Sequence, residues 1–463
     1  MSAVELFHVA GLQEATVFRL VAGLPERIIA IHRGEAVSAA RFESHVRALA
    51  ATLPSGCHAV NLCEDRYRFL VALCAVAIRG QVNLLPPSRA PGVVAETLLN
   101  YPEAYGLGDG PAEPGREIPR DIRSAGWRMP EVLEELEGPP LMVDADAVVV
   151  IGFTSGSTGR PAANAKTWGS FRISTMQNLA ALRSLWATDV HANVVATVPP
   201  QHMYGMELSI MLPLLAEVGV HGARPFFPED VACALRGTPM PRLLVTTPVH
   251  LRALVESGVE LPPLAGIVSA TAPMPEGLAR EAELRFGCEL REMFGSTETC
   301  ILASRRTARS PAWMPFPGVT VQAHPDGSVV YAAHLPSPVA LADVVEVASD
   351  GSFQLRGRQA DLLEIAGKRA SLNELTHRLL SVPGVEDGVV FQLEPGIAGG
   401  VGRIAALAVA PGMQAVDILR LLRAHVDPVF LPRKLRCVPS LPRNETGKLP
   451  RAELLGLLEA ADR

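Results

Sequence analysis

Residues 58–85 read HAVNLCEDRYRFLVALCAVAIRGQVNLL, and this stretch decides the expected fold. Two short apolar runs, 58–62 and 81–85, have the length and composition of buried strands. The longer apolar run between them, 66–80, has the pattern of a buried helix. Continuously apolar strands that alternate with helices indicate sheets covered on both faces. The stretch therefore predicts an α/β fold.

The same alternation continues along the first two thirds of the chain. Helical patterns such as 275–287 lie between most of the further strand-like runs, which occupy 147–151, 193–198, 242–247, 265–270 and 289–294. These runs are apolar without a break, as expected for strands that have helices on both sides. We therefore expect a large N-terminal α/β domain built of layered sheets.

After about residue 310 the pattern changes to short strands that begin at turns. The runs 326–333 and 350–357 each open on Asp-Gly, a turn signal, and continue as strands. Helices and strands alternate again in the rest of the chain. We predict an N-terminal domain at 1–356 that ends in a β-rich subdomain, and a small mobile α+β domain at 357–463.

The composition limits the kind of protein. The 463 residues are 48% hydrophobic and carry a formal net charge of −6, with no basic block suited to nucleic acid. The seven cysteines form no Cys-x-x-Cys pair, which favours reduced thiols over a zinc site. The N-terminus lacks a secretory signal, and the longest apolar run, 69–78, is too short to cross a bilayer. We expect a cytoplasmic protein with no membrane span.

A cluster of hydroxyl side chains follows the apolar run 147–151. Residues 152–159 read GFTSGSTG, and Lys166 lies shortly after them. Glycines that let the backbone approach closely, with short donors around them, suit phosphate oxygens. The loop is not of the G-x-x-x-x-G-K-[ST] type, because no Gly-Lys pair follows at that spacing. Taken alone, the loop fits a phosphate site and a polar surface turn equally well.

A second polar cluster ends the strand at 289–294. The stretch 293–299 reads MFGSTET, which places a glycine turn, hydroxyls and the carboxylate of Glu298 after that strand. Open α/β sheets bind ligands at the carboxyl ends of strands, and a carboxylate beside a phosphate site is a candidate Mg²⁺ ligand. Asp343, Arg358 and Lys448 lie in turns or strand ends further on. Taken singly, each of these residues also fits a cap, a turn or a solvated surface.

Together these stretches resemble the adenylate-forming superfamily, which includes acyl-CoA synthetases, adenylation domains of non-ribosomal peptide synthetases, and luciferases. The resemblance extends from about residue 58 to the C-terminus, and the segments follow the order of the family. The matching segments are FTSGSTGRP (153–161), PPQHMYG (199–205), SATAP (269–273), FGSTE (294–298), LAD (341–343), GRQADLLEIAGKR (357–369) and NETGK (444–448).

The resemblance implies a chemical role for five of the matching residues. Lys448 would contact the substrate carboxylate and the α-phosphate during adenylation. Thr297 would contact the α-phosphate, and Glu298 would hold Mg²⁺. Asp343 would bond the ribose hydroxyls with help from Arg358. These roles agree with the chemistry, because a cation and a metal must offset the repulsion between a carboxylate and a phosphate.

The resemblance also implies binding roles for the loops. His202, which the resemblance also places among the catalytic residues, would lie between the acyl pocket and the thiol channel. The β- and γ-phosphates of ATP would be held by Thr154, Ser155, Gly156, Ser157, Thr158, Gly159 and Lys166. The rest of the nucleotide would contact Ser269, Ala270, Thr271, Phe294, Gly295 and Ser296.

Three segments depart from the family pattern. The lysine that usually follows the phosphate loop is Ala162 here, and Lys166 is the candidate substitute. The Thr-Gly before the aspartate is replaced by Leu341 and Ala342, and the hinge position that is usually Asp or Lys is Ala360. Because hinge motion can be absorbed by many residue types, we expect catalysis to survive.

The segments PPQHMYGME (199–207), KTW (166–168) and GKRASLNEL (367–375) resemble a subgroup of small AMP-ligases. Members of that subgroup start the synthesis of aryl polyene pigments. That subgroup activates an aromatic acid and passes it to an acyl carrier protein, so the resemblance implies ATP, Mg²⁺ and a carrier-protein partner. A synthetase that uses free CoA, and a nucleotide-binding homologue without catalysis, stay open as alternatives. Carrier proteins are acidic, and the candidate docking residues, which an ordinary solvated face explains as well, are Arg433, Lys434, Arg436, Lys368 and Arg369.

Overall fold

The chain forms two compact units. The computed structural model describes residues 16–86, 89, 91–109, 127–154, 162–187, 189–324, 327–341, 343–358, 362–365, 368–393, 403–423, 426–444 and 449–460. Unit 1 comprises Met1–Leu179 and Pro200–Arg224, and unit 2 comprises Ala180–Pro199 and Pro225–Arg463.

Unit 1 contains a six-stranded sheet with parallel strands at its centre. The strand order is β10-β9-β5-β4-β6-β7, and β4 runs parallel to β5 and β6 while β5 runs parallel to β9. Its strands are β4 (His58–Asn61), β5 (Val82–Leu85), β6 (Ala104–Gly108), β7 (Trp127–Arg128), β9 (Val148–Thr154) and β10 (Ala162–Thr167). The carboxyl ends of β4, β5 and β9 therefore meet at one edge of the sheet.

Helix α2 (Arg66–Ile78) connects β4 to β5, as the stretch 58–85 predicts. The side chain of Asp65 accepts a hydrogen bond from the Arg68 N–H and caps the first turn. Nearly every residue of α2 is buried, because the helix contacts α1 (Ala39–Thr52) as well as β4 and β5. This all-round contact explains why the segment is apolar on every side instead of amphipathic.

The other elements of unit 1 surround this sheet. Helix α3 (Pro91–Asn100) packs Val94 and Leu98 against Val60 and Leu84 of the sheet. The remaining strands are β1 (Val17–Arg19), β2 (Ile28–His32), β3 (Glu35–Ser38), β8 (Met142–Asp144) and β12 (Gly219–His221). The remaining helices are α4 (Trp168–Leu182), which continues to the start of unit 2, α5 (Met203–Met206), a π-helical turn at Glu207–Met211, and α6 (Leu212–Leu215).

In unit 2, six strands pair in the order β17-β16-β15-β14-β13-β11. Strands β11 (Asn193–Ala196), β13 (Arg242–Thr246), β14 (Gly266–Ser269) and β15 (Glu289–Ser296) are parallel, and β16 (Cys300–Arg305) and β17 (Met314–Pro315) continue antiparallel. Helices α7 (Pro228–Arg236), α8 (Pro248–Glu256) and α9 (Glu276–Phe286) contribute to one apolar core with these strands. A short 3₁₀ turn, Arg183–Leu185, precedes β11.

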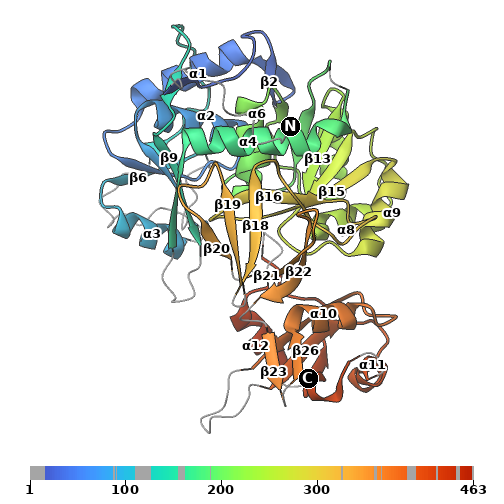
Figure 1. Ribbon diagram of the computed structural model, residues 1–463. Coiled ribbons are helices and arrows are strands. Elements are labelled where there is room, and N and C mark those ends of the chain that lie inside the picture. Colours follow the sequence, from blue (N-terminus) through green and yellow to red (C-terminus); the bar gives the residue numbers. More distant parts are fainter. Residues whose placement is uncertain are drawn as a thin grey trace. The chain divides into compact units, whose positions relative to one another are not determined.

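A β-rich segment follows, as the two Asp-Gly turns predict. Strands β18 (Val319–His324), β19 (Gly327–Ala332) and β20 (Val339–Leu341) lie side by side in one antiparallel sheet (Figure 1). Two strand pairs come next: β21 (Asp343–Val347) with β22 (Phe353–Arg358), and β23 (Leu362–Ile365) with β24 (Lys368–Ser371).

The C-terminal part of unit 2 is a three-stranded sheet with helices on both faces. Its strands are β25 (Asp387–Gln392), β26 (Ile404–Val409) and β27 (Lys434–Cys437), and its helices are α10 (Leu372–Leu380), α11 (Ala415–Leu422) and α12 (Arg451–Glu459), with a 3₁₀ turn at Pro428–Phe430 (Figure 1). Alternate residues of β26 face opposite cores. Ile404 and Ala406 pack with α10 and α11, whereas Ala405 and Leu407 pack with α12.

The α/β fold predicted from the sequence is confirmed. Each strand-like run named above contains an observed strand, and the predicted helix at 275–287 is α9. The predicted domain boundary between residues 356 and 357 stays a prediction, and the strand β22 runs across it.

Candidate functional site

The carboxyl ends of the parallel strands β14 and β15 meet at one edge of the sheet in unit 2. Ser269 is the last residue of β14 and pairs with Glu292 of β15, so the segments 269–271 and 294–298 leave neighbouring strands at the same side. Ligands of open α/β sheets bind in this position. The structure thus brings together two of the segments that the sequence selected.

Ser269 and Thr271 present buried hydroxyl groups at this edge. Both hydroxyl oxygens are inaccessible to solvent, and neither has a hydrogen-bond partner among the described residues. Thr271 also has a φ angle of +79°, which is unfavourable for a β-branched residue. Unpartnered buried hydroxyls and local backbone strain are features that concentrate at ligand-binding sites.

The turn after β15 is shaped by Gly295. A β-bulge interrupts the register between Phe294 and Gly295, and a Cβ atom at Gly295 would lie 2.1 Å from the carbonyl oxygen of Cys300. Only glycine permits this close approach of β15 to β16. The approach turns the backbone directly into residues 296–299.

Thr299 fixes the conformation of that turn. The Ser296 N–H donates to Thr299 Oγ1 at 3.1 Å, and the Thr299 N–H donates to Ser296 Oγ at 3.2 Å. The carbonyl oxygen of Thr299 is 2.8 Å from Nε2 of the buried His334. The sequence analysis missed Thr299 and His334, although the repeated hydroxyls of STET offered a signal for Thr299.

Glu292 connects the two strand-end segments. Its side chain is 2% exposed and accepts hydrogen bonds from the Met274 N–H at 2.9 Å, from Arg305 Nε at 2.7 Å and from Thr307 Oγ1 at 2.5 Å. These contacts join the segment after β14 to β15 and β16. The sequence analysis did not select Glu292, because it looks like an ordinary strand residue.

Phe294 lies in an aromatic cluster beside the turn. Its ring centroid is 5.4 Å from that of Trp313 and 5.7 Å from that of Phe353, and both of those rings are buried. Phe294 itself is half-buried. Its predicted contact with the adenine stays a prediction, and the cluster explains how the ring is held in place.

Thr297 and Glu298 are half-buried residues in the turn that Gly295 and Thr299 define. Carboxylate and hydroxyl oxygens are the donors that Mg²⁺ prefers. The described residues contain no cluster of three or more His, Cys, Asp or Glu side chains that could hold a metal by themselves. A single carboxylate beside a phosphate fits Mg²⁺ that is held jointly by protein and nucleotide.

The predicted ribose residues, Asp343 and Arg358, are direct partners in a strand pair. Asp343 begins β21 and Arg358 ends β22, and their Cα atoms are paired in the antiparallel register. The Asp343 carbonyl accepts a hydrogen bond from Ser328 Oγ at 2.7 Å. The strand register therefore makes the two residues neighbours, and their role with the ribose stays a prediction. Leu341 is buried at the end of β20, and Ala342 and Ala360 lie outside the described residues.

The predicted phosphate loop connects β9 to β10 in unit 1. Ser155, Gly156, Ser157, Thr158 and Gly159 lie outside the described residues, and Thr154 ends β9. Ala162, which replaces the usual lysine, pairs with Thr154 across the mouth of this connection.

Lys166 is the candidate substitute for the lysine that the family usually has at position 162. It lies further along β10 than Ala162. It pairs with Val150, its side chain is buried, and four residues of strand place it about 13 Å from Ala162. Its role with the phosphates stays a prediction.

The motif segment PPQHMYG belongs to unit 1 from its second residue, Pro200, onward. His202 is the N-cap residue of α5, and its carbonyl accepts the Met206 N–H at 2.7 Å. Met203 and Tyr204 are both buried, at 8% and 7% exposure. Lys448, the predicted catalytic lysine, lies outside the described residues.

The basic residues predicted to dock a carrier protein fall into three groups. Arg433 and Lys434 are exposed at the start of β27. Arg436, in contrast, donates to the carbonyls of Leu457 and Ala460 at the end of α12. Arg436 therefore contributes to helix capping. Lys368 and Arg369 lie in β24, and nothing in the described side chains tests their role.

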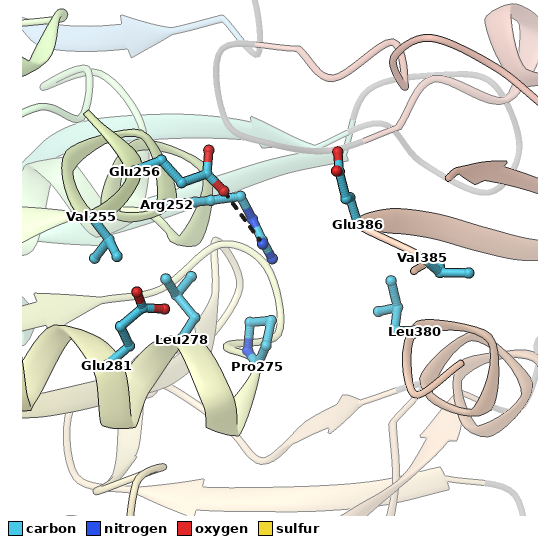
Figure 2. Close-up of a pocket in the computed structure, with 9 residues that line it drawn as sticks. All are labelled: Arg252, Val255, Glu256, Pro275, Leu278, Glu281, Leu380, Val385 and Glu386. Carbon is cyan, nitrogen blue, oxygen red and sulfur yellow. Dashed lines mark ion pairs between the residues drawn. The ribbon is translucent and has the colours of Figure 1, made fainter. Parts of the chain in front are cut away.

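A cavity of about 340 Å³ lies elsewhere in unit 2 (Figure 2). Arg252 and Glu256 of α8 form an ion pair of 3.9 Å at its rim. Its described lining residues are Arg252, Val255, Glu256, Pro275, Leu278, Glu281, Leu380, Val385 and Glu386. None of the site residues predicted from the sequence belongs to this lining.

The family description "AMP-binding enzyme" matches residues 102–334, just over half of the chain. The chain belongs to the AMP-binding enzyme family. The matched region includes the phosphate loop, the end of β14 and the turn after β15, whereas Asp343 and Lys448 follow it. The protein is an AMP-forming acid–thiol ligase.

Similar proteins with assigned activities include two kinds of ligase. A 4-coumarate–CoA ligase of Halorhodospira halophila is 29% identical over 311 residues, which cover 64% of this chain and 73% of the relative. An L-proline–[L-prolyl-carrier protein] ligase of Pseudomonas fluorescens is 24% identical over 391 residues, which cover 73% and 74% of the two chains.

Solved structures share the fold. The o-succinylbenzoate CoA synthetase from Bacillus subtilis, solved with its acyl-adenylate intermediate, superposes with a TM-score of 0.80 at 19% identity. The superposition covers 95% of this chain and 96% of that structure. In the described part of the chain, no helix is both long and apolar enough to cross a membrane.

Proposed function

We propose that this ligase activates a carboxylic acid, most suitably an aromatic one, with ATP and Mg²⁺, and transfers the acyl group to the phosphopantetheine thiol of an acyl carrier protein. A carboxylate oxygen forms a bond to the α-phosphorus of ATP, and the bond to pyrophosphate breaks. The thiolate then forms a bond to the acyl carbon, and AMP leaves. No side-chain nucleophile is required, because the acid itself attacks.

One observation carries this proposal. The unpartnered hydroxyls of Ser269 and Thr271, with the strained backbone of Thr271, lie beside the turn that Gly295 and Thr299 hold in shape. A polar ligand that approaches this edge can satisfy the buried hydroxyls. A nucleotide is such a ligand, and the family to which the chain belongs binds one.

The protein's own residues would divide the work between binding and charge. Thr297 would donate to the α-phosphate, and Glu298 would hold Mg²⁺, which offsets the charge that develops on the phosphate oxygens. Asp343 and Arg358 would orient the ribose from their paired strands. Lys448 would approach the carboxylate and the α-phosphate. These assignments rest on the resemblance of their segments to the family pattern.

The acceptor thiol has two candidates. Carrier-protein transfer is supported by the relative that loads a prolyl-carrier protein and by the exposed Arg433 and Lys434 at the start of β27. Transfer to CoA is the second candidate, because the 4-coumarate relative is a CoA ligase. The 4-coumarate relative also supports an aromatic acid.

The decisive experiment is ATP–pyrophosphate exchange with a panel of acids. The panel contains benzoic, cinnamic and dicarboxylic acids and medium-chain fatty acids, and CoA or a carrier protein is added afterwards. We expect exchange with an aromatic acid and product formation with the carrier protein. If none of the acids in the panel supports exchange, the proposal is contradicted. A carrier-protein KM that is unchanged in Arg433→Glu/Lys434→Glu would contradict docking at these residues.

Replacing Lys448 tests the adenylation step. Lys448→Ala removes the cation that offsets repulsion between two anions, so we expect exchange to fall by at least about 100-fold, as when one preorganised electrostatic group is lost. ATP binding, measured by calorimetry, should persist. Near-normal exchange in this variant would show that Lys448 has another role.

A further inference from the structure

Arg89 lies at the same edge of the unit 1 sheet as the entrance to the predicted phosphate loop. It follows β5, and β5 is the direct parallel neighbour of β9, which leads into that loop. The segment after β4, with Glu64 and Arg66, emerges at this edge as well. Because ligands of parallel sheets bind outside the carboxyl ends of the strands, Arg89 occupies a position suited to ligand contact.

The Arg89 side chain is held in place by neutral groups. Its Nη2 donates to the Cys63 carbonyl and to Gln201 Oε1, which is 3.3 Å away and adjoins His202 in the chain. Its Nε is buried and has no hydrogen-bond partner among the described residues. The side chain is 20% exposed, so a solute can reach it.

The Glu64 carboxylate is a weak partner of Arg89, and the buried Asp109 carboxylate, which also acts to raise the pKa of Arg89, lies 3.6 Å from Arg68 Nε. Nη1 is 3.8 Å from the Glu64 carboxylate, and that carboxylate is 69% exposed. Ion pairs of this kind contribute little, because water screens them. A donor therefore remains for a better anionic partner at this guanidinium.

The charge of Arg224 strengthens the positive potential at Arg89 and acts on the neighbouring Arg66 as well. The backbone N–H of Arg66 donates to the backbone carbonyl of Gly222 at 2.8 Å. This hydrogen bond places the segment that contains Arg224 beside the start of α2. Burial and then the charge of Arg224 lower the pKa of Arg66 to about 9. Burial also lowers the pKa of Arg89, and the Arg224 charge contributes to this decrease. Like charges that share a partly buried region favour an anion there.

We propose that Arg89, assisted by the charge of Arg224, binds a phosphate or carboxylate group of a substrate. This inference rests on the proposed ligase function and adds a recognition element to it. Three substrates can supply the anion: the 3′-phosphate of CoA, a second carboxylate on the acid, or a phosphate of ATP. A guanidinium is suited to all three, because its N–H groups match pairs of oxygens.

The test compares ligands that differ by the anionic group alone. CoA is compared with 3′-dephospho-CoA, and succinic acid with its monomethyl ester, by calorimetry; KM for ATP is measured with the best acid of the panel. Arg89→Gln should weaken one anion-bearing ligand at least tenfold and leave its uncharged counterpart unchanged. Arg89→Lys should retain part of the preference, because the charge stays.

A matched control separates recognition from bracing. Arg47 also belongs to unit 1 and donates to backbone carbonyls, those of Leu136 and Pro139, so Arg47→Gln removes a brace of the same kind. It should change no ligand preference. The proposal is overturned if Arg89→Gln weakens the binding of both members of every ligand pair equally. It is also overturned if the variant weakens the binding of none of them. Calorimetry needs no turnover, so absence of exchange in the wild-type enzyme contradicts the ligase function separately.

Discussion

At the scale of single residues, the site combines strain with unpaired polar groups. Thr271 holds a left-handed backbone, and its hydroxyl is buried without a partner among the described residues. Both features cost free energy in the isolated protein, about 1–3 kcal/mol for the backbone strain. A residue that served stability alone would be glycine here. We therefore expect that a ligand uses the hydroxyl of this threonine.

Thr271→Gly should increase stability and reduce activity. Glycine adopts the φ of +79° without strain, and the relief exceeds the extra entropy that glycine gives to the unfolded chain, for a net gain of about 1 kcal/mol. Loss of the hydroxyl should raise KM for ATP several-fold. Urea unfolding and ATP–pyrophosphate exchange measure the two effects.

Arg33→Gly is the matched control for this substitution. Arg33 has a φ of +52° in the turn between β2 and β3, which contains none of the predicted site residues. The free energy of unfolding of Arg33→Gly should increase by about as much as that of Thr271→Gly. The kinetics of ATP–pyrophosphate exchange should stay unchanged. An ATP KM in Thr271→Gly equal to that of the wild type would remove Thr271 from the nucleotide site.

At the scale of elements, the site depends on how β15 turns into β16. Gly295 allows the two strands to approach, and the pair formed by Ser296 and Thr299 closes the turn. Glu292 then joins this region to the segment that follows β14. The turn between β15 and β16 thus sets the positions of Thr297 and Glu298, which are half-buried.

Gly295→Ala should disturb this arrangement. The new Cβ would lie 2.1 Å from the Cys300 carbonyl, so the strands must separate, at a cost of about 1–3 kcal/mol or more. Exchange activity should fall together with stability, because residues 296–299 move. Chemical denaturation and the exchange assay report both changes.

Gly277→Ala, in the same unit, should raise stability where Gly295→Ala lowers it. Gly277 lies in α9, and its added Cβ would meet no atom within 4 Å. Alanine should stabilise the helix by about 0.5–1 kcal/mol with no effect on exchange. A Gly295→Ala variant that behaves like Gly277→Ala would show that the turn tolerates a wider spacing.

The elements could be predicted from the sequence better than the contacts between them. The stretch 58–85 gives its strand, helix and strand because apolar runs of different length report local structure directly. The hydrogen bond from His334 to Thr299 joins residues that only the folded chain brings together, so no local pattern reveals it. The pairing of Asp343 with Arg358 was implied only as a shared role, and the strand register supplies the contact.

At the scale of the whole molecule, burial of histidines makes stability depend on pH. Burial lowers the pKa of five of them: His32, His45, His58, His221 and His377. A neighbouring carboxylate partly opposes this effect at several sites, as Glu135 does at His45. The folded protein therefore binds fewer protons than the unfolded chain in mildly acidic solution.

The free energy of unfolding should decrease on acidification. A lowered pKa in the folded state means that the stability is complete above the unfolded value of about 6.5 and is lost as the pH falls below it. Each such histidine adds at most about 1.4 kcal/mol per pH unit to this slope. Urea unfolding at pH 7.5, 6.5 and 5.5 should give a plateau followed by a decrease.

His45→Gln tests one of these buried histidines. His45 is 5% exposed, its Nδ1 shares a 2.7 Å hydrogen bond with the Tyr67 hydroxyl, and Arg41 and His32 add positive charge near its ring. Glutamine can keep a hydrogen bond to Tyr67 and cannot take up a proton, so the decrease below pH 6.5 should become shallower. If His45→Gln retains the full wild-type slope, His45 does not contribute to the acid sensitivity.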